Sequence, residues 1–490
     1  MDVHLRSTTV CALDAETGEA VARRFRGNPW GEVAEWMSGF PGPSLAAYES
    51  GYLGFAPQRE LSALGVDCVV AAVSKVPRSA ADLSSKNDRN DAARMAKAIL
   101  SHDVTPVWVP SPEIEGLRDL AAAHDAATAR LAAAKQRLLA FLAHRGYVYG
   151  GTTPAGNPRK YWTYGFLRWL DKVRPADDGG IRALAALRNE VEAAGEAREA
   201  LLAEYRAAVA AGPLSAEVEA LQSIKGCGFV LAAAFASEVG DFSRFRSGRQ
   251  VTAYFGLAPK QRSSAGSVRL GGISGAGNAL VRRLAVEGSW RYAQAGHRPK
   301  LMPKGSGVPL EIRMHGRKGS ERLLRRREGM LERGMPQAKA NAATAAELVR
   351  WLWALGTMCR GGRRIDIAPV PASRAAFGDT PVLAVRAAVA AFASTDLGNP
   401  PPKERIAGRR SGIRGYETEP KASTTCRGRT GTGSTAGPAD RLQAVGGAIV
   451  ALDSGLGHMS ETASAESIWP ERGGSTPYGG DRRMSAKSAS

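Results

Sequence analysis

Two aspartates three residues apart are the first feature of this sequence that could carry chemistry. Asp88 and Asp91 occur in "KNDRNDAARMA" (residues 86–96), a stretch whose composition predicts a helix. At that spacing both carboxylates would lie on one helix face, one turn apart, where like charges repel. They are either two solvated carboxylates, each beside an arginine (Arg89 or Arg94), or half of a metal site.

Two further carboxylates could complete such a site. Asp2 begins an expected first strand, and Glu49 ends the apolar run "SLAAYES". A carboxylate on a first strand, one at the end of a later strand and a pair on a following helix make up the ribonuclease-H-like metal cluster. Four oxygen donors suit Mg²⁺. Two such ions can activate a nucleophile and stabilise the leaving oxygen of a phosphodiester.

A second group of residues could supply a nucleophile or contact phosphates. "QRSSAGSVRLGG" contains Ser263 and Ser264 in a Gly-rich, basic stretch that we expect to be a loop. A hydroxyl there is either an exposed nucleophile or ordinary turn chemistry. "IKGCG" resembles the turn of a helix-hairpin-helix unit, in which Gly226 and Gly228 would free backbone N–H groups for a DNA phosphate; the alternative is a tight interhelical turn.

Lysine and arginine are dense in residues 297–334, where four arginines fall on or near one helical turn. We expect contacts to backbone phosphates, a solvated basic helix being the alternative. We expect Trp351 and Trp353, further along, to be core residues. The residues expected to bind nucleic acid are Gly226, Gly228, Arg262, Ser263, Arg269, Arg282, Arg283, Arg325 and Arg326.

The overall composition is that of a basic intracellular protein. Lys and Arg number 66 against 47 Asp and Glu, which gives a formal charge of +19 and favours a polyanion partner. Five scattered cysteines fit a reducing cytosol and exclude a disulfide framework or a cysteine-based zinc site. No apolar run approaches the ~20 residues that span a bilayer, and the N-terminus lacks a signal-peptide pattern.

The expected elements place the carboxylates in an N-terminal α/β domain. We expect one strand over residues 2–14, a hairpin partner near 18–27, and a strand–helix–strand unit by residue 74. Two long helical stretches follow, which fold back on each other or pair with a second chain. We expect four parts: an α/β domain (1–111), a helical coiled-coil linker (112–215), a mostly α domain (216–365) and a disordered basic tail (366–490).

Several segments together resemble one known family. "DVH" before a strand, "YESGYLGF" and "KNDRNDAARMA" look like the successive acidic motifs of the insertion-sequence one-ten family of transposases. The stretch from "SIKGCG" through "QRSSAGSVRLGGISGAGN" to "ALVRR" is similar to that family's C-terminal transposase domain, and "RLLRRREGMLERG" to its closing helices. The resemblance covers roughly residues 1–365 and rests on motif order, spacing and the long helical separator.

The resemblance implies a RuvC-like N-terminal domain, a C-terminal transposase domain and a reaction. Asp2, Glu49, Asp88 and Asp91 would bind Mg²⁺, and Ser264, with Ser263 as the fallback, would attack DNA and hold one strand as a phosphoserine ester. The implied partners are the DNA of the element ends and target, a structured bridge RNA, and further copies in a dimer or tetramer. The implied location is the bacterial cytoplasm, at the nucleoid.

Two alternatives to this recombinase stay open, and one feature departs from the family. Water instead of serine could attack, as in a hydrolytic junction resolvase, or the chain could be a degenerate copy that only binds nucleic acid. Relatives have a strand's worth of residues before the first aspartate, whereas only Met1 precedes Asp2 here. We therefore expect a shortened first strand.

Overall fold

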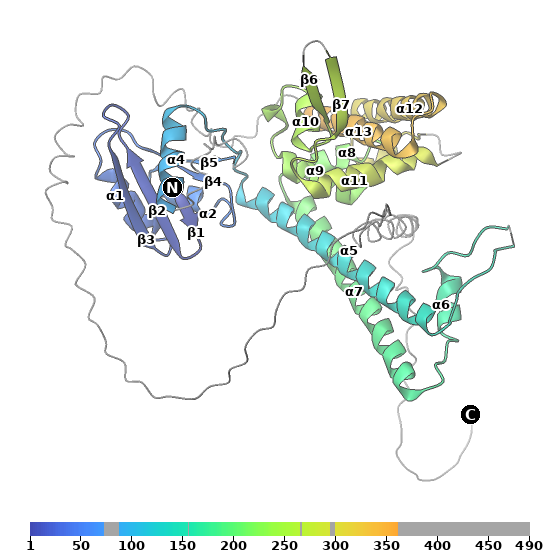
Figure 1. Ribbon diagram of the computed structural model, residues 1–490. Helices are drawn as coiled ribbons and strands as arrows, with labels where there is room; N and C mark the ends of the chain where they lie inside the picture. The colour runs from blue at the N-terminus through green and yellow to red at the C-terminus, as the bar shows by residue number, and fades with distance from the viewer. Residues whose placement is uncertain (73–87, 155, 265–266, 295–298, 361–490) are drawn as a thin grey trace, which may run out of the picture. The chain divides into compact units, whose positions relative to one another are not determined.

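The computed structural model describes residues 1–72, 88–154, 156–264, 267–294 and 299–360 (Figure 1). The expected tail at 366–490 lies outside these residues. The chain divides into two compact units. Of the described residues, unit 1 contains 1–126 and 199–360, and unit 2 contains 127–198.

The N-terminal part of unit 1 is a mixed α/β fold, as the sequence predicted. Three strands form an antiparallel sheet in the order β1-β2-β3, and β4 and β5 pair in parallel. The elements are β1 (Asp2–His4), β2 (Ser7–Leu13), β3 (Ala20–Arg26), α1 (Trp30–Ser38), β4 (Leu45–Glu49), α2 (Ala56–Ala63), β5 (Asp67–Ala71) and α4 (Asp88–Leu100).

The single strand expected over residues 2–14 was wrong, because the chain reverses within it. β1 and β2 are separate antiparallel strands joined through Leu5 and Arg6, with Asp2 opposite Thr9. β1 is short, as expected, and it lies beside β4: the Met1 α-amine donates a hydrogen bond to the Ala47 carbonyl at 2.7 Å. Burial lowers the pKa of that amine to about 6.

Apolar residues at alternate strand positions form the core of this part. Val10, Phe25, Tyr48 and Val70 are buried against α1 and α2, where Leu61 is also buried. The intervening Ala47 and Val69 are buried against α4, so both faces of the parallel pair are covered, as is usual for parallel strands. The sheet is therefore a fixed platform for the polar residues at its edge.

The C-terminal part of unit 1 is mostly helical, again as predicted. Its elements are α8 (Ser215–Leu221), α9 (Phe229–Val239), η2 (Phe242–Arg244), α10 (Gly248–Tyr254), β6 (Pro259–Ser264), β7 (Ser267–Ile273), α11 (Ala279–Ser289), η3 (Trp290–Ala293), η4 (Lys304–Ser306), α12 (Leu310–Glu332) and α13 (Gln337–Arg360). Almost every residue of α9 is buried, and α13 packs against α8, α10, α11 and α12. Trp351 and Trp353 pack on this core, as expected.

Two glycines in this part touch each other through their backbones. Gly226, in the turn between α8 and α9, has φ +87°, and a Cβ built on it would lie 2.4 Å from the carbonyl oxygen of Gly288. A Cβ on Gly288 would lie 2.2 Å from the carbonyl oxygen of Gly226. This contact, which we call the glycine pair, fixes the α8–α9 turn against α11.

The two expected long helices are α5 (Pro112–His144) and α7 (Asp178–Ala211), and α6 (Tyr164–Leu170) lies between them. They fold back on each other, which was one of the two expected arrangements. In unit 2 Leu131, Leu138 and Val191 share an apolar core, and Arg137 Nε lies 3.2 Å from Glu190. Pairing with a second chain stays a prediction.

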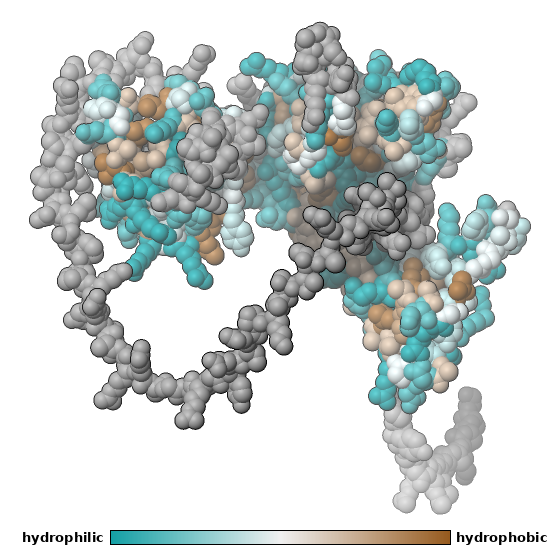
Figure 2. Space-filling model, viewed as in Figure 1, coloured by the Kyte–Doolittle hydropathy of each residue, from teal (hydrophilic) through white to brown (hydrophobic). Residues whose placement is uncertain are grey.

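Hydrophilic side chains cover much of the visible face of the C-terminal helices, with smaller apolar areas between them (Figure 2). Among the described residues, no helix combines the length and apolar character needed to cross a bilayer.

Candidate functional site

Four acidic residues of the N-terminal part come from three elements, and side-chain contacts join them in two sets. Asp2 is the first residue of β1, and Glu49 is the last residue of β4, opposite Ala71 of β5. Asp88 and Asp91 fall in the first turn of α4. Carboxylates at a helix N-terminus are stabilised by the helix dipole, and residues at the carboxyl end of a parallel strand face the edge where ligands bind.

Small buried residues hold α4 close to the sheet. Ala92, Met95 and Ala98 form its buried face, and the helix packs against β2 and β4. Met95 and Ala98 share a core cluster with Ala47 and Val69 of the parallel strands. Because two of the three helix residues are alanine, the backbone of α4 can approach the sheet and bring its acidic first turn to the edge.

Arg94 contacts one carboxylate at the end of a strand and one on the helix. Its guanidinium lies 2.9 Å from Glu49 Oε1 and 2.8 Å from Asp91 Oδ1. The Arg94 side chain is 14% exposed, and its Nε is buried without a hydrogen-bond partner in the part of the chain that is described. Arg24 of β3 lies 3.6 Å from Asp88 Oδ2. The solvated alternative foresaw an arginine beside Asp91, but not its second contact with Glu49.

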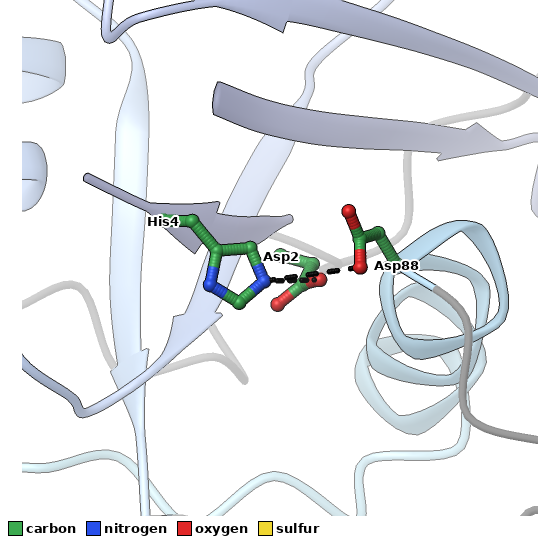
Figure 3. A group of neighbouring side chains, drawn as sticks. All are labelled: Asp2, His4 and Asp88. Atoms are coloured by element: carbon green, nitrogen blue, oxygen red, sulfur yellow. Dashed lines mark hydrogen bonds and ion pairs between the residues drawn. The ribbon is translucent and has the colours of Figure 1, made fainter. Parts of the chain in front are cut away.

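His4, which the sequence pattern did not indicate, lies beside Asp2, with Asp88 on the far side of Asp2 (Figure 3). Its Nε2 is 3.0 Å from Asp2 Oδ2 and 4.0 Å from Asp88 Oδ1. The signal that could have found it is its position two residues after Asp2, because residues i and i+2 of a strand share a face.

The pKa of Asp2 indicates that the negative charges of Asp88 and Asp91 are close enough to repel it. Burial raises the pKa of the Asp2 carboxyl, the contact with His4 opposes that change, and the charges of Asp88 and Asp91 add to it. A carboxylate in such surroundings resists ionisation unless a cation joins it. Asp2 and Asp88 offer carboxylate oxygens within 4.8 Å of each other, and hard oxygens at that spacing fit a divalent ion. Glu49 and Asp91 contact Arg94.

Ser263 and Ser264 lie in a β-hairpin and not in the expected loop. β6 and β7 pair with Ser263 opposite Val268 and Ser264 opposite Ser267. At the base of the hairpin, Ser274 donates its backbone N–H to Ala258 at 2.8 Å. Both serines therefore lie at the end of the paired strands opposite this base, and the strands project away from the helices (Figure 1).

The loop after the hairpin is held by close backbone contacts and one partly buried acid, Glu238. Gly277 has φ +80°, and a Cβ there would lie 1.9 Å from the carbonyl oxygen of Tyr254. Glu238 accepts hydrogen bonds from the Tyr254 hydroxyl at 2.9 Å and from Asn278 Nδ2 at 3.1 Å. These contacts fix where the hairpin leaves the helical domain.

The residues expected to contact nucleic acid fall in four places, and their role stays a prediction. Gly228 is the N-cap of α9 with open space around its Cα, whereas Gly226 packs in the glycine pair. Arg262 and Arg269 are opposite each other on β6 and β7. The remaining arginines belong to two helices: Arg282 and Arg283 to α11, and Arg325 and Arg326 to α12.

Several of these arginines already have protein partners. Arg282 donates to the carbonyls of Phe255 and Ala276, and Arg283 pairs with Asp125 and Glu287. On α12, Arg322 lies 2.7 Å from the buried carboxylate of Glu347, which also pairs with Arg326. Arg327 is buried and Arg325 is exposed. Part of the basic density therefore holds α12 to α13.

Comparison with known proteins finds two matching family profiles. One, described as "Transposase IS116/IS110/IS902 family", matches residues 218–302, and one of DEDD transposases of the IS110 type, described as "Transposase", matches residues 1–145. The chain is 32% identical to a putative transposase, y4qE, of Sinorhizobium fredii over 320 residues, which is 64% of this chain and 75% of that protein. It is 25% identical to the transposase for insertion sequence element IS1533 of Leptospira borgpetersenii, over 56% of this chain and 79% of that protein.

Proposed function

The chain belongs to the IS116/IS110/IS902 family of transposases, and we propose that it cuts and rejoins DNA through a carboxylate-bound metal and a serine nucleophile. It is a DNA transposase of the DEDD type. The resemblance found in the sequence is thereby confirmed. The observation that supports the proposed chemistry is the proximity of Asp2 and Asp88, whose carboxylate oxygens lie within 4.8 Å of each other although they come from β1 and α4.

The strand arrangement supports a RuvC-like, ribonuclease-H-like N-terminal domain. Three antiparallel strands are followed by a parallel pair, and the Met1–Ala47 hydrogen bond sets β1 beside β4. Asp2, Glu49, Asp88 and Asp91 would hold the ion, for which the family resemblance implies Mg²⁺. A divalent cation in this place would supply Lewis-acid stabilisation of charge on the transferring phosphate.

Ser264 is the proposed nucleophile. Its hydroxyl loses the proton, and the oxygen forms a bond to phosphorus. The phosphorus–oxygen bond to the leaving strand breaks, and the leaving oxygen takes up a proton. One phosphodiester is exchanged for another, so the bond energy is kept for rejoining. Splitting strand exchange into two transesterifications is the advantage of covalent catalysis.

The proposed partners are DNA, a bridge-type guide RNA, and further copies of the chain in a dimer or tetramer. The formal charge of +19 supports binding of polyanions. If base pairing of the RNA reads donor and target, the protein needs to bind backbone and shape only. Exposed Arg325 and the paired strands carrying Arg262 and Arg269 are the proposed backbone contacts.

Covalent trapping tests this function. Full-length protein is mixed with co-purifying RNA, labelled DNA carrying element ends, and Mg²⁺; denaturation then preserves any protein–DNA ester. We expect an adduct that maps to Ser264, is abolished in Ser264→Ala and persists in the matched control Ser263→Ala. Asp91→Asn should also abolish it while leaving RNA binding intact.

The outcomes separate the alternatives. A Ser264→Ala variant that still cleaves fully would identify a hydrolytic nuclease in which water attacks. Loss in Ser263→Ala with retention in Ser264→Ala would assign the nucleophile to the neighbouring serine. Neither adduct nor cleavage would leave a protein that only binds nucleic acid.

A further inference from the structure

His4 adds a nitrogen donor to an edge that otherwise offers oxygen. The imidazole comes from β1, as Asp2 does, and Figure 3 shows its Nε2 directed toward the Asp2 and Asp88 carboxylates. The His4 side chain is 56% exposed, so water has access to the same space. The donor atoms of His4, Asp2 and Asp88 all lie within 4.8 Å of one another.

The spacing of these atoms matches that of ligands around one ion. Octahedral ions with ligand distances of ~2.1 Å place neighbouring ligand atoms ~3.0 Å apart and opposite ones ~4.2 Å apart. His4 Nε2 is 3.0 Å from Asp2 Oδ2 and 4.0 Å from Asp88 Oδ1, within that range. Asp2 and Asp88 need little rearrangement to share an ion with the ring.

Donor chemistry then affects which ion is preferred. Mg²⁺ binds oxygen and water and keeps much of its hydration shell, whereas first-row transition ions accept imidazole nitrogen readily. We propose that His4 is a metal ligand, together with Asp2 and Asp88, and that it biases this site toward a first-row transition ion such as Mn²⁺ over Mg²⁺. This inference rests on the proposed function, because the two aspartates belong to the carboxylate cluster.

Paramagnetic Mn²⁺ tests the ligand directly, without an activity measurement. Full-length protein is titrated with Mn²⁺ and the bound ion is examined by pulsed electron paramagnetic resonance, which detects a coordinated ¹⁴N. We expect nitrogen modulation in the wild type and its loss in His4→Asn. The Mn²⁺ dissociation constant should rise about tenfold or more in that variant, and that for Mg²⁺ by less than about threefold.

The control is His102→Asn, which removes a histidine from an exposed turn of the same domain. His102 has φ +57°, a conformation that asparagine tolerates. The nitrogen signal and both affinities should be unchanged in this variant. Circular dichroism and thermal unfolding of His4→Asn should match those of the wild type, which separates loss of a ligand from loss of folding.

Each remaining outcome overturns a definite statement. Mn²⁺ bound by wild type without nitrogen modulation, and equally tightly by His4→Asn, would make His4 only a hydrogen-bond partner of Asp2 and leave the carboxylate site standing. No saturable binding of Mn²⁺ or Mg²⁺ to the wild type would overturn the metal site of the proposed function as well.

Discussion

Replacing Arg94 by methionine should destabilise the N-terminal domain in the absence of divalent ions, and added ions should restore much of the loss. Arg94 contacts Glu49 at 2.9 Å and Asp91 at 2.8 Å, so its guanidinium balances charge that a metal would otherwise balance. Methionine keeps the length and apolar stem of the side chain and removes only the charged end. The acidic residues are then left facing one another.

The size of the effect follows from the burial of the three groups. Breaking a fully buried ion pair costs about 3–5 kcal/mol, and an exposed pair contributes about 1 kcal/mol or less. The exposed fractions are 14% for Arg94, 28% for Glu49 and 24% for Asp91, which places the pair between these limits. We expect a loss of about 2–3 kcal/mol, or roughly 10 °C in the unfolding midpoint of a domain of this size.

A bound ion should reduce the difference in unfolding free energy between Arg94→Met and the wild type. An ion that binds only the folded state stabilises it by about 2.7 kcal/mol at a concentration of 100 times its dissociation constant. The variant should gain more than the wild type, because no guanidinium has to leave its carboxylates. With saturating ion, the stability difference between variant and wild type should therefore fall to less than half its value without ions.

Differential scanning calorimetry with and without Mg²⁺ or Mn²⁺ measures both quantities. The matched control is Lys97→Met, which removes an exposed positive charge from the same helix and should shift the midpoint little in either condition. An Arg94→Met protein as stable as wild type without ions, or one that ions do not stabilise further, would refute the reasoning that arginine and metal share these carboxylates.

Three further predictions concern other contacts. Gly277→Ala should cost more than about 3 kcal/mol in thermal unfolding, because its φ is +80° and the new Cβ would lie 1.9 Å from a carbonyl oxygen, whereas Gly272→Ala, with open space around it, should be close to neutral. Glu347→Ala should lower stability by about 1–3 kcal/mol in denaturant titration, because this carboxylate is 7% exposed between two arginines of α12. Asp2→Asn should stabilise the metal-free domain by about 1 kcal/mol or less at neutral pH. Because the pKa of Asp2 is raised in the folded state, protonated Asp2 contributes its full stability below the pKa of the unfolded chain, and this stability is lost as pH rises through the folded pKa. The gain in unfolding free energy of Asp2→Asn over wild type should therefore vanish in acid titrations near pH 3.8.

The sequence indicates which acidic residues could form the N-terminal site, and their joint role as metal ligands stays a prediction. Residue type and expected positions on strands and a helix indicate Asp2, Glu49, Asp88 and Asp91. The structure brings Asp2 and Asp88 together beside His4, whereas Glu49 and Asp91 share Arg94. The reversal between β1 and β2 was missed because Leu5 and Arg6 carry none of the glycine, proline or asparagine signals of a tight turn.

Long-range partners were the hardest to foresee. The second contact of Arg94, with Glu49, depends on how α4 packs across the sheet, which no local pattern encodes. Glycine and serine dominate the stretch around Ser263 and Ser264 and predict a loop, although the chain pairs there in regular register. Tertiary pairing outweighed local preference in both places.

The glycine pair restricts how this protein can accommodate mutation. At most packed sites a larger residue can be offset by a smaller neighbour, but Gly226 and Gly288 each lie against the other's carbonyl, and no smaller amino acid exists. A suppressor of a substitution at either position would have to move α11 as a whole. Genetic screens for revertants there should return glycine at the substituted position, and no change at the other position of the pair should compensate.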